Sequence, residues 1–100
     1  MHIIVWKFTV REGRIQEFIG AYGCDGDWAQ LFRSGEGYLG TRLLRSADDV
    51  NIFVTVDRWN NADCFEAFKK QYGTEYNELD ARFEAYTLSE EKLGGFSEVE

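Results

Sequence analysis

The sequence predicts one α+β domain (residues 1–100) of the ferredoxin-like class, with a four-stranded antiparallel sheet and the order β-α-β-β-α-β. Three observations support this prediction. Residues 2–10 alternate with a period of two, as a strand does. Segments 14–22 and 61–83 instead carry apolar side chains at helical spacing. Residues 38–45 and 50–59 are rich in β-forming residues, and the short acidic connection between them is typical of a hairpin. Two helices around a hairpin, with a further strand at each end, form the split βαβ arrangement.

In the first half of the chain, one strand precedes two helical segments. The strand places four large apolar residues on one face, namely Ile4, Trp6, Phe8 and Val10. The first helix carries the stripe Ile15, Phe18, Ile19 and Tyr22. Glycines in segment 23–26 end this helix. Asp25 or Asp27 is then positioned to cap a short second helix over residues 28–33.

The second half contains the hairpin, a long helical segment and a last strand. Asn61 is expected to be the N-cap of the helix, because an apolar stripe follows it. The stripe consists of Phe65, Phe68 and Tyr72 and, later, Tyr76, Leu79 and Phe83. Gly73 interrupts it, so we expect a kink or two stacked helices. Residues 88–91 are expected to form a loop and residues 92–99 a weak strand, in which Gly94-Gly95 indicates a bulge.

The composition narrows the classes of partner. The net charge is −7, and eleven acidic residues accompany five basic ones from residue 57 onward. Such a chain repels phosphates, so we expect no nucleic-acid partner.

No apolar run approaches the roughly 18 residues of a membrane span, and the N-terminus does not resemble a signal peptide. We therefore expect a cytoplasmic protein without a membrane partner. Cys24 and Cys64 are expected to be free thiols, and a single histidine leaves no metal site of the zinc type.

The predicted sheet is apolar on both faces, although two helices can cover only one of them. The first strand presents Ile3 and Val5 on the second face, and the third strand presents Ile52, Val54 and Val56 on one of its two sides. An apolar face of this extent is too large to leave in water, and its burial contributes about 25 cal/mol per Å². We therefore expect a homodimer in which two such faces pack together as a dimeric α+β barrel.

One segment resembles a known family. In residues 55–68, TVDRWNNADCFEAF, a strand ends in Trp59, a small polar cap follows, and a Phe-containing helix begins. This pattern is similar to a hallmark of the antibiotic biosynthesis monooxygenase superfamily, and residues 13–18 and 37–41 resemble its first helix and second strand. The resemblance implies a dimeric α+β barrel with a pocket between helices and sheet in each subunit. It implies oxidation of aromatic polyketides or quinols without metal or flavin for some members, and haem degradation for others.

The resemblance extends to individual site positions only in part. Polyketide oxygenases of the family tend to have an Asn four residues before the Trp and a Tyr six residues after it. This chain has Thr55 and Phe65 there. Haem-degrading members tend to have an Asn on the first strand and a His ten residues after the Trp, where this chain has Trp6 and Lys69. The position that this chain shares with both patterns is Trp59.

Aromatic and polar residues on the helix-covered side are the candidates for a site. Trp59 is either a core residue or a pocket wall that donates an electron to an oxygenated substrate. Asp57 shares its face of the strand and is the candidate base. The candidates for substrate binding, each with plain packing as the alternative, are Trp6, Tyr22, Trp28, Phe32, Tyr38, Arg42, Phe68 and Tyr72. Arg42 follows the alternation of Tyr38 and either lies on an exposed edge, forms an ion pair or binds a substrate oxyanion.

Two hypotheses of function stay open. In the first, the protein is a cofactor-independent monooxygenase of a flat phenolic, quinol-like or polyketide-like molecule, with a base and hydrogen-bond donors in a dry pocket. Oxygen uptake is then expected to be lost in Trp59→Phe. In the second, the same pocket binds an aromatic small molecule without turnover. Haem binding would need an axial ligand, and the only histidine is His2, beside the N-terminus.

Overall fold

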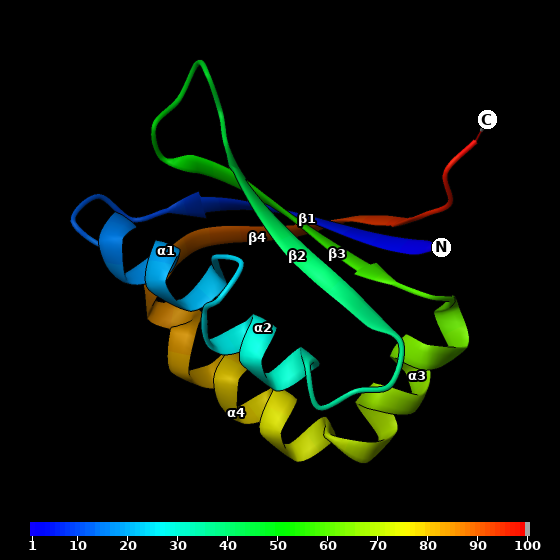
Figure 1. Ribbon diagram of the computed structural model, residues 1–100. Helices are drawn as coiled ribbons and strands as arrows, with labels where there is room; N and C mark the ends of the chain where they lie inside the picture. Colours follow the sequence, from blue (N-terminus) through cyan, green and yellow to red (C-terminus); the bar gives the residue numbers. More distant parts are fainter. Residues whose placement is uncertain (100) are drawn as a thin grey trace.

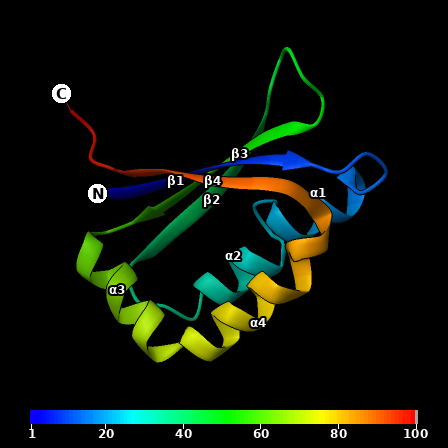
Figure 2. The same ribbon diagram turned by 180° about the vertical axis from the view of Figure 1, so that it is seen from behind.

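A four-stranded antiparallel sheet carries every described helix on one of its faces in the computed structural model, which describes residues 1–99 (Figures 1 and 2). The strands are β1 (His2–Val10), β2 (Tyr38–Arg45), β3 (Ile52–Trp59) and β4 (Thr87–Phe96). The helices are α1 (Ile15–Tyr22), α2 (Asp27–Phe32), α3 (Ala62–Gln71), α4 (Gly73–Phe83) and the 3₁₀ helix η1 (Glu84–Tyr86). The strand order β2-β3-β1-β4, with antiparallel pairing throughout, confirms the predicted ferredoxin-like fold.

The hydrophobic core lies between the helices and one face of the sheet. On this face β1 presents Ile4, Phe8 and Val10, next to Phe53 and Trp59 of β3, and all five side chains are buried. The helices contribute the buried residues Phe18, Ala21, Tyr22, Trp28, Ala29, Phe32, Phe65, Phe68 and Phe83. Each large aromatic side chain removes roughly 150–250 Å² from water when it is buried. This aromatic packing therefore attaches the helix layer to the sheet.

The start of α2 differs from its prediction. The helix begins at Asp27, its N-cap is Gly26, and no side chain caps it, so the prediction of a cap by Asp25 or Asp27 is wrong. A Cβ at Gly26 would lie 2.6 Å from the carbonyl oxygens of Gly20 and Ala21. The close approach of two backbone segments therefore requires glycine at the position that a capping side chain would occupy.

The long helical segment of the second half follows its prediction closely. Asn61 is the N-cap of α3, and its side-chain oxygen accepts the N–H of Cys64 at 2.9 Å. The long segment is divided into α3 and α4 at Tyr72 and Gly73, as the interrupted stripe predicts. No helix within residues 1–99 has the length and apolar character needed to cross a membrane.

The last strand is longer at its start than predicted. The expectation of a loop over 88–91 is wrong, because these residues belong to β4 and three of them pair with residues 7–9 of β1. β4 is an edge strand whose side chains are mostly exposed and polar, so its sequence lacks a visible apolar alternation. The strand ends at Phe96 rather than at residue 99. A register shift beside Gly94, which has a φ of 143°, confirms the predicted bulge.

A bulge in β2 changes which face its side chains occupy. The pairing with β3 skips Leu39, so Tyr38 lies opposite Trp59 while Arg42 lies opposite Val56. Tyr38 therefore faces the helices and Arg42 faces the other side of the sheet. The prediction that these two residues share one face is wrong, because an inserted residue shifts the period of two by one position.

The second face of the sheet has no helix over it within the part of the chain that the structure describes (Figure 1). It carries the apolar residues Ile3, Val5, Leu44, Ile52, Val54, Val56 and Phe96, with Lys7, Arg42 and Arg58 among them. Leu44 and Phe96 are about half exposed, and the residues of β1 and β3 are half-buried. A single chain thus leaves an apolar sheet face without a packing partner.

Candidate active site

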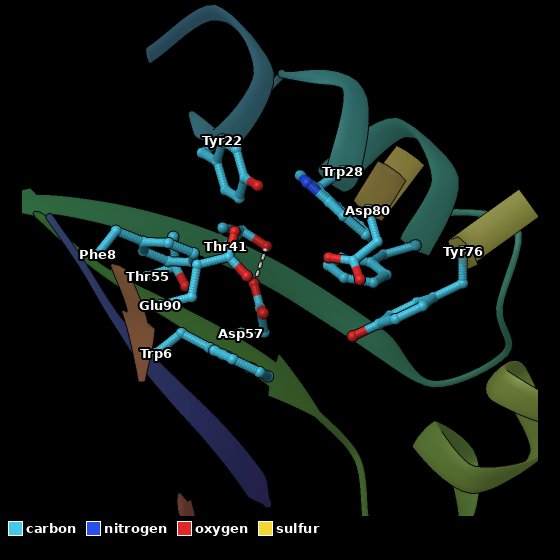
Figure 3. Close-up of a pocket in the computed structure, with 11 residues that line it drawn as sticks. Trp6, Phe8, Tyr22, Trp28, Thr41, Thr55, Asp57, Tyr76, Asp80 and Glu90 are labelled. Carbon is cyan, nitrogen blue, oxygen red and sulfur yellow. Dashed lines mark hydrogen bonds between the residues drawn. The ribbon is translucent and has the colours of Figure 1, made fainter. Parts of the chain in front are cut away.

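A partly enclosed pocket of about 50 Å³ lies between the sheet and the helices (Figure 3). Side chains from β1, β2 and β3 form its floor, α1, α2 and α4 form its roof, and Glu90 of β4 stands at its mouth. The lining residues are Trp6, Phe8, Tyr22, Trp28, Phe32, Thr41, Thr55, Asp57, Tyr76, Asp80 and Glu90. An engineered cavity that binds benzene measures about 150 Å³. Side chains around the mouth must therefore move to admit even one aromatic ring.

The floor of the pocket is polar because of the composition of β3. The helix-facing side of this strand consists of Phe53, Thr55, Asp57 and Trp59. Phe18 of α1 packs on Phe53 and Phe32 of α2 packs on Trp59, with ring centroids 5.2 Å and 5.8 Å apart. The helices thus rest on the two aromatic ends of the strand and leave a threonine and a carboxylate uncovered between them.

Asp57 is the most deeply buried acid of the pocket, at 8% exposure. Its Oδ1 accepts a 2.7 Å hydrogen bond from the hydroxyl of Thr41, which lies 2.5 Å from the hydroxyl of Tyr38. Because Thr41 has one hydroxyl proton, Tyr38 is then the donor to Thr41. Burial raises the pKa of Asp57 to about 6, and the hydrogen bond from Thr41 opposes this increase. A carboxyl with such a pKa can exchange a proton near neutral pH.

Three hydrogen-bond donors reach the pocket from the helices, namely the side chains of Tyr22, Trp28 and Tyr76. Burial raises the pKa of the Tyr22 phenol, and it raises that of Tyr76 to about 12. Both hydroxyls therefore stay protonated and can donate hydrogen bonds. The indole nitrogen of Trp28 points toward the Tyr22 hydroxyl (Figure 3) and opposes the increase in its pKa, but it has no hydrogen-bond partner of good geometry within residues 1–99.

Two further carboxyls stand at the mouth of the pocket, and both are exposed. Asp80 lies one helical turn after Tyr76 on α4, and Glu90 lies opposite Phe8 in the ladder between β1 and β4. Burial raises the pKa of Glu90, and Asp80 adds to the increase. The hydroxyl of Thr87 donates to Glu90 at 3.3 Å. Within residues 1–99, no group of His, Cys, Asp and Glu is arranged to hold a metal ion.

The structure brings half of the sequence candidates together. Trp6, Tyr22, Trp28, Phe32 and Asp57 all line the pocket. Trp6 comes from β1 and lies next to Thr55, the position where the resemblance places an Asn. These five residues come from four different elements, so their shared cavity is a consequence of the fold.

The other candidates lie outside the lining. Trp59 is fully buried and Phe68 nearly so, and both belong to the core behind Phe32. Tyr72 stacks on Phe68 at 5.4 Å, and Tyr38 reaches the pocket through Thr41. Arg42 is exposed on the opposite face of the sheet. His2 is also absent from the lining.

Five lining residues are not among the sequence candidates, namely Phe8, Thr41, Thr55, Asp80 and Glu90, and a sixth, Tyr76, is expected only as one of several tyrosines that could donate hydrogen bonds. The alternation of β3 contains a signal for its floor, because two polar residues interrupt an otherwise apolar face. Tyr76 and Asp80 are four residues apart and so share a helix face. The sequence does not indicate Glu90, because the segment that contains it is predicted to be a loop.

Comparison with solved structures gives matches over nearly the whole chain. Two crystal structures of SnoaB, a cofactor-independent oxygenase from Streptomyces nogalater, match with TM-scores of 0.78 (a mutant, 24% identity) and 0.75 (22% identity). Each match covers 99% of this chain and 93% of SnoaB. A conserved protein from Methanosarcina mazei Go1 matches with a TM-score of 0.73 and 13% identity, over 98% of this chain and 92% of that one. At these identities the matches establish the fold.

The family follows from the sequence itself. A search of curated proteins found no match. The family model described as antibiotic biosynthesis monooxygenase matches residues 1–73, which include β1 to β3, the first three helices and the cap at Asn61. The chain therefore belongs to the antibiotic biosynthesis monooxygenase family.

Proposed function

We propose that the protein is an oxygen-dependent monooxygenase of a small phenol or quinol-like molecule, with Asp57 as its base. The observation that carries this proposal is a buried carboxyl with a pKa of about 6 at the floor of an aromatic pocket, oriented by Thr41. Such a group can remove a phenolic proton near neutral pH while the aromatic walls exclude water. Membership of the monooxygenase family and the fold shared with SnoaB, a cofactor-independent oxygenase, support the same class of reaction.

The proposed reaction balances without an added reductant. Ionised Asp57 takes the phenolic proton, the phenolate reduces O₂, and a C–O bond forms at a ring carbon ortho or para to the phenolic oxygen. Asp57 then returns its proton to the peroxide. Removal of the ring hydrogen by the same carboxylate breaks the O–O bond and leaves a C=O group. The released hydroxide takes that proton and becomes water. The substrate loses four electrons, all of them to O₂, and becomes a quinone.

Donors on the pocket roof suit the oxygen-bearing intermediates. The indole N–H of Trp28 is buried and has no hydrogen-bond partner of good geometry within residues 1–99. A phenolate or peroxide oxygen would accept this N–H, and the hydroxyl of Tyr22 lies beside it. We assign Trp59 a supporting role, because it packs behind Phe32 and does not line the pocket.

We also propose that the chain works as a homodimer. The sheet face opposite the helices is apolar and has no packing partner within residues 1–99, and a second copy offers a face of the same apolar character. Arg42 would then lie in the interface between subunits, where the neighbouring residues are Val5 and Val56.

Oxygen uptake tests the function directly. We expect consumption of O₂ with single-ring hydroquinones and phenols, and a loss of about 100-fold or more in Asp57→Asn. The matched control is Asp48→Asn, an exposed acid in the hairpin, which should keep the wild-type rate. Wild-type uptake in Asp57→Asn would contradict the role of Asp57. If a broad panel of these compounds quenches tryptophan fluorescence but consumes no O₂, the protein is a binding module and not an oxygenase.

A further inference from the structure

The pocket is acidic as well as aromatic. Its lining includes the carboxyls of Asp57, Asp80 and Glu90, and none of the eleven described lining residues is Lys, Arg or His. The ion pairs found within residues 1–99 involve none of these three acids. Lys92 is the basic residue closest in strand register, opposite Trp6, but it does not line the pocket. Within residues 1–99, therefore, no ion pair neutralises these carboxyls.

The charged side chains that line the pocket are all acidic. Burial is the main cause of the raised pKa of Tyr22 and Tyr76, and nearby carboxyls add to it, together with the Tyr76 phenol in the case of Tyr22. Asp80 and Glu90 act on both tyrosines, and Asp57 acts on Tyr76. Because the whole chain also carries a net charge of −7, the pocket favours a cationic ligand over an anionic one.

The remaining lining favours an organic cation. Six of the eleven lining residues are aromatic, and the rings of Trp28 and Tyr76 meet edge to face with centroids 4.9 Å apart, one turn before Asp80. Aromatic faces combined with carboxylates are the chemistry that recognises ammonium groups. A metal ion suits the site less well, since the carboxyls of residues 1–99 form no metal-binding group.

A second, independent feature points to an oxygen on the same ligand. Trp28 is 8% exposed, and its buried indole N–H, which points toward the Tyr22 hydroxyl (Figure 3), has no hydrogen-bond partner of good geometry within residues 1–99. This donor needs an acceptor, which an ammonium group cannot provide. Asp57 is buried at the floor of the pocket, while Asp80 and Glu90 are exposed at its mouth. This difference in depth indicates which end of the ligand lies at the floor and which lies at the mouth.

We propose that the pocket takes a single-ring phenol carrying a protonated amine on a short side chain. The phenolic oxygen lies at Asp57 and the indole N–H of Trp28, and the ammonium group lies between Asp80 and Glu90. This assignment names the substrate class of the monooxygenase proposed above, and it rests on that function for its chemical outcome.

Three ligands of nearly equal size test the assignment. Tyramine, 4-ethylphenol and 4-hydroxyphenylacetate share the phenol ring and a short para chain, and they end in an ammonium, a methyl and a carboxylate group. We expect tyramine to bind at least about tenfold more tightly than 4-ethylphenol at low salt, and 4-hydroxyphenylacetate not to bind. Titration calorimetry without O₂ measures this order. Equal affinities, or no binding of tyramine, would overturn the proposal.

Substitutions at the mouth locate the ammonium group. Asp80→Asn and Glu90→Gln should each lower the preference for tyramine over 4-ethylphenol by about fivefold, without weakening 4-ethylphenol. The matched controls are Glu78→Gln on α4 and Glu91→Gln, which lies on the opposite face of β4, and both should keep the preference. All four acids are exposed, so the variants should fold, and thermal unfolding verifies this. A preference that survives in both mouth variants would place the cation elsewhere and refute the assignment.

The two proposals fail in distinguishable ways. Selective binding of tyramine without oxygen uptake from any phenol would uphold the ligand class and reject the monooxygenase. Oxygen uptake from neutral hydroquinones, without a preference for the amine, would uphold the monooxygenase and reject the ligand class.

Discussion

The hydroxyl of Thr41 donates a 2.7 Å hydrogen bond to Asp57, and the two residues are direct partners in the ladder between β2 and β3. Direct partners in a sheet hold their side chains at a fixed separation, so the carboxylate is oriented by the strands and not by a loop. This hydrogen bond favours ionised Asp57, while burial disfavours it more strongly. The balance places the pKa of the carboxyl near 6, where a base for neutral pH is required.

Removal of this hydrogen bond should shift the pH dependence of the reaction. The proposed reaction needs ionised Asp57, so oxygen uptake should rise with pH through a pKa of about 6. In Thr41→Val the ionised form loses its donor, so the pKa of Asp57 rises and the acidic limb moves to higher pH by about one pH unit. Rates of oxygen uptake measured from pH 5 to 8 give the pH at which the activity rises. Thr41→Ser keeps the hydroxyl and should keep the limb in place. An unmoved limb in Thr41→Val would show that another group controls it.

Burial of Asp57 should also make stability depend on pH. The pKa of the carboxyl is raised from its ordinary 3.8 to about 6 in the folded state, so the folded protein binds this proton more tightly than the unfolded chain. The contribution of this group to stability therefore grows as pH falls from 6 toward 3.8. Above pH 6 its ionised form costs about 3 kcal/mol.

Asp57→Asn removes that cost. The variant should exceed the wild type in free energy of unfolding by up to about 3 kcal/mol at pH 8, with the difference vanishing near pH 4. Urea unfolding at the two pH values measures it, and other titrating groups cancel in the comparison. The exposed control Asp48→Asn should show no such trend. A variant that is less stable than the wild type at pH 8 would mean that the carboxylate is stabilised by its surroundings.

The fold could be predicted from the sequence wherever one face of an element is buried. The alternation of β1 and the cap at Asn61 are examples, because burial and capping leave patterns of residue type. The sequence predicts only part of β4, because an exposed edge strand is held by backbone pairing, which leaves no such pattern. Gly26 is the N-cap of α2 because the carbonyl oxygens of Gly20 and Ala21 leave no room for a side chain there. The sequence does not show which backbone segments lie this close in space.

The site could be predicted only in part, for a related reason. The sequence indicates Asp57 because it shares a strand face with Trp59 and no bulge separates them. The sequence predicts the wrong face for Arg42, because no residue pattern in it indicates the bulge at Leu39. Glu90 reaches the pocket through a register between distant strands, which residue types alone do not specify.

Substitutions of the two buried tryptophans, Trp59 and Trp28, should affect stability and oxygen uptake differently. Trp59 is completely buried in the core, so Trp59→Phe should lower the free energy of unfolding by about 1–3 kcal/mol and leave oxygen uptake per folded molecule unchanged. Trp28→Phe removes the proposed oxyanion donor, so it should lower uptake at least about tenfold. Urea unfolding and oxygen uptake on both variants make the comparison. Loss of uptake in a Trp59→Phe protein of wild-type stability would instead restore the role that the family resemblance suggests for Trp59.

The uncovered sheet face gives the last prediction. Val56 lies in the middle of this face, between Val5 and Arg42 in the ladder. In a dimer built on the face, Val56→Lys would bury an unpaired charge beside a like charge, so the variant should dissociate. Sedimentation at micromolar concentration should find a dimer for the wild type and a monomer for Val56→Lys. Val50→Lys, at an exposed position before β3, should remain dimeric. The wild-type dimer should also unfold at a temperature that rises with protein concentration, whereas a wild type that sediments as a monomer would refute the proposed interface.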